Sequence, residues 1–100
     1  DDIESRKEPF LKRINSLPEE WLAAGELEII EINRQLQVDL PEANHYHTLA
    51  GFLLDNFQQV PSKGDSLADT GILYEIISMR GPRIETVKII LPQRPSKNDF

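Results

Sequence analysis

The sequence predicts a small α+β domain in which an antiparallel sheet packs against two short helices. In residues 48–58, apolar side chains recur at helical spacing and polar side chains occupy the other side. Residues 72–79 and 83–91 instead alternate as strands do, and the turn Arg80-Gly81-Pro82 between them favours antiparallel pairing. Because one amphipathic helix cannot bury its apolar face alone, we expect this helix to lie across the sheet.

Two further strands and a second helix are expected before this central helix. Residues 10–14 alternate imperfectly after Pro9, as an edge strand does, and residues 21–24 form a second strand that ends at Gly25. The turn at residues 16–18 lets these two strands pair as a hairpin. In residues 27–36 the isoleucines would also suit a strand, but their spacing predicts a helix with one apolar stripe, formed by Ile29, Ile32 and Leu36.

The connections carry weaker signals. Pro41 favours an extended Leu40, so residues 38–42 are expected to turn Val38 and Leu40 inward. Asn44 and Thr48 are both suitable caps for the central helix, and the sequence does not choose between them. Pro61 and Gly64 are expected to stop that helix, and residues 66–69 form a short strand candidate.

Alternation assigns faces to the last two strands. Tyr74, Ile76 and Ser78 are expected on one face, and Ile84 is expected to share a face with Lys88. Both faces of the final strand carry apolar residues near its end, which predicts a strand inside the sheet, covered on both sides.

Composition limits the class of protein. One hundred residues, 39% of them hydrophobic, suffice for a single domain. With 17 acidic against 11 basic residues, the net charge of −6 disfavours nucleic acid and anionic membrane surfaces as partners. The chain has no cysteine, so disulfides and cysteine metal sites are excluded. It also has no apolar run of about 20 residues, so we expect no direct membrane insertion by this segment.

The ends of the chain suggest a division into three parts. The chain begins with Asp1 and no signal-peptide pattern follows, so we expect a fragment of a longer protein. Residues 1–9 are interpreted as a linker from upstream domains, residues 10–91 as the folded domain and residues 92–100 as a flexible tail.

Candidate metal ligands are few. His45 and His47 lie on one side of an extended segment, and Glu42 is the only further candidate ligand nearby in the sequence. Zinc needs three or four ligands that are held in place by a second shell of residues. The acidic set Glu26, Glu28 and Glu31 is better explained as the solvated face of a helix. We therefore predict no metal site.

Catalytic and cofactor motifs are not found. The sequence has no glycine-rich phosphate loop and no Gly-x-Ser-x-Gly motif, so no catalytic residue is predicted. Trp21 and Tyr74 could stack on a flat ligand, although they also suit a core or sheet surface. Arg80 and Arg83 could meet an anionic group, although they also suit the solvated end of a hairpin.

An ordered set of short motifs resembles the transporter-associated domain of the CorC/HlyC family, from about Phe10 to Leu91. The set comprises Trp21-Leu22, Gly25, Leu27 to Asn33 with Leu36, Asp39-Leu40-Pro41-Glu42, Tyr46, Thr48 to Leu54, Phe57, Val60-Pro61, Gly64-Asp65, Met79-Arg80-Gly81, Arg83-Ile84 and Val87. Two positions depart from the family pattern. His47 stands where an acidic residue is common, and Pro82 lies inside the final turn.

The resemblance implies an α+β fold like that of FAD-binding and transporter-associated domains. It also implies a non-catalytic accessory or regulatory domain at the cytoplasmic face of the inner (plasma) membrane, with neighbouring CBS and membrane domains of the same chain as partners. Such proteins are associated with magnesium and cobalt transport or efflux, and some are named hemolysins. The alternative function, by fold analogy alone, is a module that binds FAD or an adenine nucleotide. A homo-oligomer formed through an exposed strand edge is a further possibility, and an independent enzyme is disfavoured.

Overall fold

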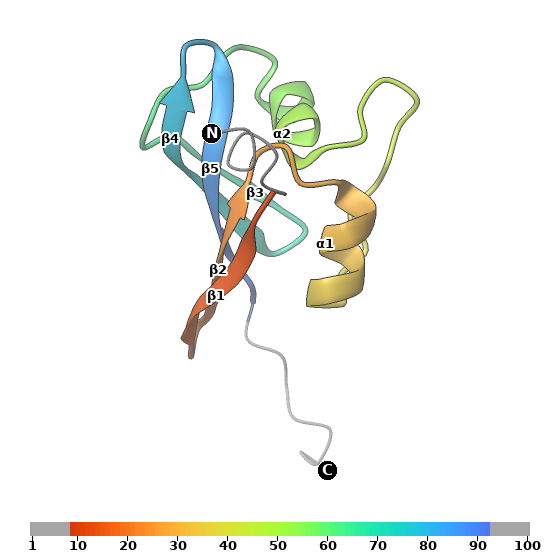
Figure 1. Ribbon diagram of the computed structural model, residues 1–100, viewed down its shortest axis with the longest axis vertical. Coiled ribbons are helices and arrows are strands. Elements are labelled where there is room, and N and C mark those ends of the chain that lie inside the picture. The colour runs from red at the N-terminus through yellow and green to blue at the C-terminus, as the bar shows by residue number, and fades with distance from the viewer. Residues whose placement is uncertain (1–8, 93–100) are drawn as a thin grey trace, which may run out of the picture.

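The computed structural model describes residues 9–92, which form five strands and two helices (Figure 1). Every element expected from the sequence is present. The predicted linker and tail lie almost entirely outside the described residues and stay predictions. The elements in chain order are β1 (Leu11–Ser16), β2 (Glu19–Ala24), α1 (Ile29–Leu36), α2 (Leu49–Phe57), β3 (Ser66–Asp69), β4 (Ile72–Arg80) and β5 (Arg83–Ile90).

The strands form one antiparallel sheet in the order β1-β2-β5-β4-β3. The final strand therefore lies in the middle, as predicted. The expectation that both its faces are covered is wrong, because both helices lie on the same side of the sheet (Figure 1). Val87 and Ile89 are buried on the helix side, whereas Lys88 and Ile90 on the other face are only half-buried.

Irregular pairing between β4 and β5 changes the face of one core residue. Ile76 pairs with Val87 and Ser78 pairs with Thr86, but the register shifts on both sides of Ser78, and Met79 then pairs with Ile84. Because each extra residue reverses the alternation of side chains, Ile84 joins Val87 in the core. The expectation that Ile84 shares a face with Lys88 is therefore wrong.

The helices supply the other half of the core. The predicted stripe of α1 is buried, and α2 buries Leu49, Phe52 and Leu53. The ring of Phe52 packs edge-on against that of Tyr74 in the sheet, with their centroids 5.6 Å apart. Burying one such large apolar side chain contributes about 1.5–3 kcal/mol. One continuous core thus joins the helices to the sheet.

The two helices begin side by side. The Ile29 amide donates to the His47 carbonyl at 2.8 Å, and the Leu49 amide donates to the Leu27 carbonyl at 2.9 Å. The Thr48 hydroxyl accepts the Gly51 amide at 3.2 Å, so Thr48 is the cap of α2. The helix ends earlier than Pro61, because Gln58 has a left-handed backbone with φ of 61°.

The connection between the helices is anchored at both ends. The Asn33 side chain donates to the Leu40 carbonyl at 3.1 Å and accepts the Leu40 amide at 2.8 Å. Leu40 is buried and Val38 packs against the core, as predicted. Further along, Tyr46 is buried against Phe52.

Candidate functional site

A groove of about 520 Å³ lies where the start of α2 meets the turn between β4 and β5. We call it the hairpin groove. Its apolar part includes Phe10, Leu54 and Ile84, and its charged part includes Arg80, Arg83 and Glu85. The lining therefore comes from segments that are far apart in the sequence.

A close backbone contact forms the base of this groove. A Cβ atom on Gly25 would lie 2.1 Å from the Ile84 carbonyl oxygen, so only glycine fits. The Gly25 amide donates to the Glu85 carbonyl at 2.9 Å, and the Gly25 carbonyl accepts the Ala50 amide at 2.8 Å. Gly25 thus connects the sheet to the first turn of α2.

Two arginines border the groove. Arg80 and Arg83 pair directly across the hairpin, and Gly81, with φ of 61°, makes the turn between them. The Arg80 Nε lies 3.7 Å from Glu85 Oε2, and the Ser78 hydroxyl donates to Glu85 Oε1 at 3.2 Å. Arg83 has no ion pair within residues 9–92.

Trp21 and Tyr74 lie away from the hairpin groove. The Trp21 indole donates to Glu19 Oε2 at 2.8 Å, and the Arg13 guanidinium lies 6.0 Å from its ring centre. Tyr74 is fully buried, in the core position that its sequence pattern also suits. Burial, with a smaller contribution from Asp69, raises the pKa of the Tyr74 hydroxyl above its usual range. Of the four predicted contact residues, the structure brings together Arg80 and Arg83.

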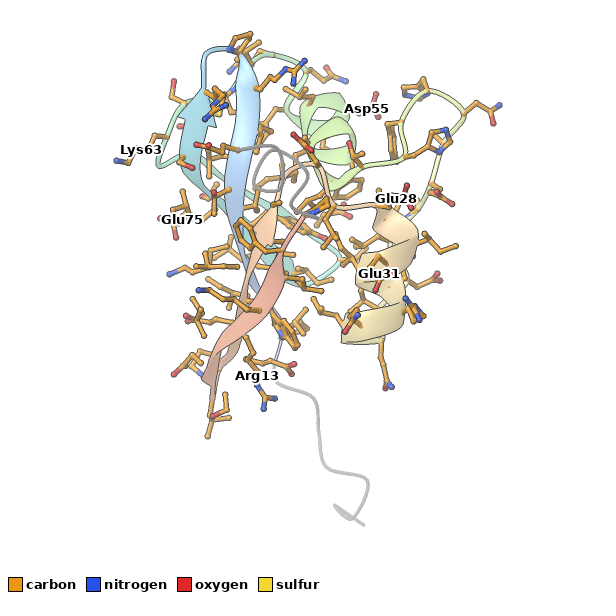
Figure 2. The ribbon with its side chains drawn as sticks, in the orientation of Figure 1. Arg13, Glu28, Glu31, Asp55, Lys63 and Glu75 are labelled. Atoms are coloured by element: carbon orange, nitrogen blue, oxygen red, sulfur yellow. The ribbon has the colours of Figure 1, made fainter. Side chains whose placement is uncertain are left out.

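Acidic residues before and within α1 line a second hollow, of about 440 Å³. Glu26, Glu28 and Glu31 all contribute to it, and Figure 2 labels Glu28, just before α1, and Glu31, on α1. Hydrogen bonds from Gln35, at 2.7 Å, and then Arg34, at 2.6 Å, lower the pKa of the Glu31 carboxyl. This carboxylate is therefore occupied by its own helix, as expected for a solvated helix face.

The two histidines face different carboxylates. His45 Nε2 lies 2.9 Å from Asp55 Oδ1, and His47 Nδ1 lies 3.6 Å from Glu42 Oε2. Within the described part of the chain, no three histidine, cysteine, aspartate or glutamate side chains gather as a metal site requires.

The face of the sheet away from the helices combines apolar and charged residues. Leu73 and Ile90 are cross-strand neighbours there. Lys88 lies beside them, 3.7 Å from Glu75 and 4.0 Å from Glu20.

Neither helix in residues 9–92 is long and apolar enough to cross a membrane.

Sequence reasoning missed the groove as a unit. The sequence pattern assigns Phe10 only to an edge strand and Glu85 only to the final strand. Gly25, as a family-like glycine, and the pair Arg80 and Arg83 are the signals that the sequence offers, but the contact of Gly25 with Ile84 depends on tertiary structure.

Comparison with known proteins gives a consistent result. Residues 16–93 match the CorC_HlyC family, described as a transporter associated domain. The chain is 27% identical over 80 residues to the UPF0053 protein YegH of Escherichia coli K12, covering 80% of this chain and 15% of YegH. It is also 27% identical over 70 residues to the polyamine export protein of Salmonella typhimurium, covering 69% of this chain and 16% of that protein. The chain thus spans about a sixth of the length of these curated relatives.

Solved structures share the fold. A transporter associated domain from a Xylella fastidiosa Temecula1 hemolysin superimposes with a TM-score of 0.71 at 26% identity, covering 87% of this chain and all of that one. A second structure from a Xylella fastidiosa Temecula1 hemolysin, in complex with Mg²⁺ and Mn²⁺, gives a TM-score of 0.65 at 28% identity, covering 84% of this chain and 98% of that one. Both are domains of about this size.

Proposed function

Because the chain belongs to the CorC_HlyC family of transporter associated domains, we propose that it is a non-catalytic accessory domain of a cation-transporting membrane protein. In this proposal it lies on the cytoplasmic side of the membrane, docks on neighbouring domains of the same chain and modulates transport. The observation that carries the proposal is the hairpin groove, because exposed aromatic and arginine side chains beside an apolar recess are typical of protein-binding surfaces.

We infer that the hairpin groove is a binding surface, because its lining combines an apolar recess with two arginines that face each other across the hairpin.

The transported species is proposed to be a cation. The resemblance implies magnesium or cobalt, one Xylella structure holds Mg²⁺ and Mn²⁺, and one relative is named a polyamine export protein. These species differ in size but share positive charge. Mg²⁺, Co²⁺ and spermidine are therefore the cargoes to compare.

The test is a flux measurement on the full-length protein in proteoliposomes. We expect removal of residues 9–92 to change the rate of cation transport, or its regulation, for at least one of the three cargoes. Equal amounts of inserted protein provide the control. Unchanged flux and regulation for all three cations would refute the proposed function.

The alternative function, binding of FAD or an adenine nucleotide, stays a prediction. The favouring observation is the pair of arginines beside an apolar recess that is large enough for a small ligand. Calorimetric titration of the 100-residue chain with AMP, ATP and FAD tests it, and the absence of heat at high ligand concentration would exclude it.

A further inference from the structure

We propose that the hairpin groove binds a short segment of the same full-length protein, in which a bulky apolar side chain lies next to a carboxylate. This inference rests on the proposed function, because it names the partner of the docking surface. The chain spans only about a sixth of its curated relatives, so a protein of that length would hold many such segments.

The apolar half of the groove is the reason why we expect a bulky apolar side chain in the bound segment. Phe10 is 43% exposed at its border, and Leu54 is only half-buried inside it. Pro82, at the turn, adds a further exposed apolar surface. Covering these atoms with one leucine-sized or larger side chain would remove them from water, which is the main favourable term in association.

The charged half of the groove is the reason why we expect a carboxylate in the bound segment. Arg80 and Arg83 carry like charges at directly opposed positions, an arrangement that costs free energy in a sheet. The Glu85 carboxylate is already held by Ser78 and Arg80, while Arg83 has no ion pair in the described chain. A carboxylate from a partner would form the charge-assisted hydrogen bonds that Arg83 lacks.

Two observations narrow the partner further. Glu26 also lines the groove, which disfavours a uniformly acidic segment. The first-turn amides of α2 are already used, since Ala50 donates to the Gly25 carbonyl and Gly51 to the Thr48 hydroxyl. The helix start therefore offers little to a phosphate group, and the arginines remain as the anion-binding groups.

The size of the groove favours a segment of the same chain over a separate protein. A stable complex between proteins usually buries about 1,600 Å² in total. A groove of about 520 Å³ holds only a few residues, so a partner that contacts the groove alone is a short segment. A tethered segment has an effective concentration in the millimolar range, so a weak contact suffices.

Photo-cross-linking in the purified full-length protein tests the inference. Phe10→p-benzoylphenylalanine places the reactive group in the groove, and Leu73→p-benzoylphenylalanine, on the open sheet face, is the matched control. We expect the groove position alone to cross-link within the same chain to a segment outside residues 1–100 that pairs an acidic with a bulky apolar residue. Mass spectrometry of the digested product identifies that segment.

Charge reversal tests the role of the arginines. We expect the double variant Arg80→Glu and Arg83→Glu to lower the cross-link yield by roughly tenfold or more, because charged hydrogen bonds are lost. Lys63→Glu, on the exposed loop before β3 (Figure 2), makes the same charge change per residue outside the groove and should leave the yield unchanged. Amide spectra of the 100-residue chain verify that the variants fold, since a transporter associated domain of similar extent has a solved structure of its own.

Several outcomes would overturn the inference. One is an equal cross-linking yield from positions 10 and 73, and another is a cross-link to a different protein. The others are a cross-linked segment without an acidic residue and an unchanged yield after the arginine reversal. Failure of the proposed function is distinguishable. In that case the cross-link forms as expected, but removal of residues 9–92 leaves cation flux and its regulation unchanged.

Discussion

A methyl group at position 25 is expected to destabilise this domain more than a methyl group at any exposed glycine. In Gly25→Ala the new Cβ would lie 2.1 Å from the Ile84 carbonyl oxygen, where ordinary contacts begin at 3.4 Å. The obstacle is backbone, so no side-chain rotation relieves it. The chain at Gly25 and the Ile84 backbone in β5 must move apart by roughly 1 Å.

The expected cost follows from this movement. Overpacking costs about 1–3 kcal/mol. The same movement weakens the hydrogen bonds from Gly25 to Glu85 and from Ala50 to Gly25, each contributing about 1 kcal/mol. The free energy of unfolding should therefore fall by about 3–5 kcal/mol, and the melting temperature by at least about 12 °C for a domain of this size.

Urea unfolding followed by the fluorescence of Trp21, the single tryptophan, measures this change. Gly64→Ala is the control, because its φ of 94° adds backbone strain but no atom lies within 4 Å of the new Cβ. We expect that control to lose only about 1–2 kcal/mol. If Gly25→Ala were as stable as Gly64→Ala, the contact between Gly25 and Ile84 would not be a close one and the reasoning would be wrong.

Three further predictions concern single side chains. Tyr74→Phe should stabilise the domain by about 1–2 kcal/mol, because the buried hydroxyl has no hydrogen-bond partner in the described chain. Because folding raises the pKa of Tyr74, the folded state holds the neutral hydroxyl, and the stability that this contributes below pH 10 is lost as the pH rises further. Urea titrations should therefore show a smaller fall in the free energy of unfolding between pH 8 and pH 11 for Tyr74→Phe than for the unchanged chain. Asn33→Ala removes both hydrogen bonds to Leu40 and should cost about 2 kcal/mol, and unchanged amide exchange at Leu40 would contradict this. Thr48→Ala removes the acceptor for the Gly51 amide and should cost about 1 kcal/mol, measurable by thermal unfolding, with a neutral result indicating that the cap contributes nothing.

The elements of the fold could be predicted because their signals are local. The stripe of α1 repeats every three or four residues, and the turn at Gly81 lies between two alternating segments. The two candidates for the cap of α2 could not be separated, because the choice of Thr48 depends on its pairing with residues before α1.

What could not be predicted depends on contacts between distant segments. The irregular pairing that turns Ile84 into the core requires the relative register of two strands, which alternation within one strand does not contain. The hairpin groove requires Phe10, Gly25 and Arg83 to meet, and these residues are separated by many positions in the chain. The arginines were candidates on chemistry alone, and their position beside an apolar recess came only from the structure.

The central place of β5 has a consequence for synthesis of the protein. Before residues 83–90 leave the ribosome, the earlier strands can form only the separate hairpins β1–β2 and β3–β4, because β2 and β4 meet solely through β5. The hydrophobic faces of the two hairpins therefore stay exposed on the nascent chain, where chaperones can bind them, until nearly the last described residue has been added. A stop codon before residue 83 would release a chain whose two hairpins lack the strand that joins them into one sheet.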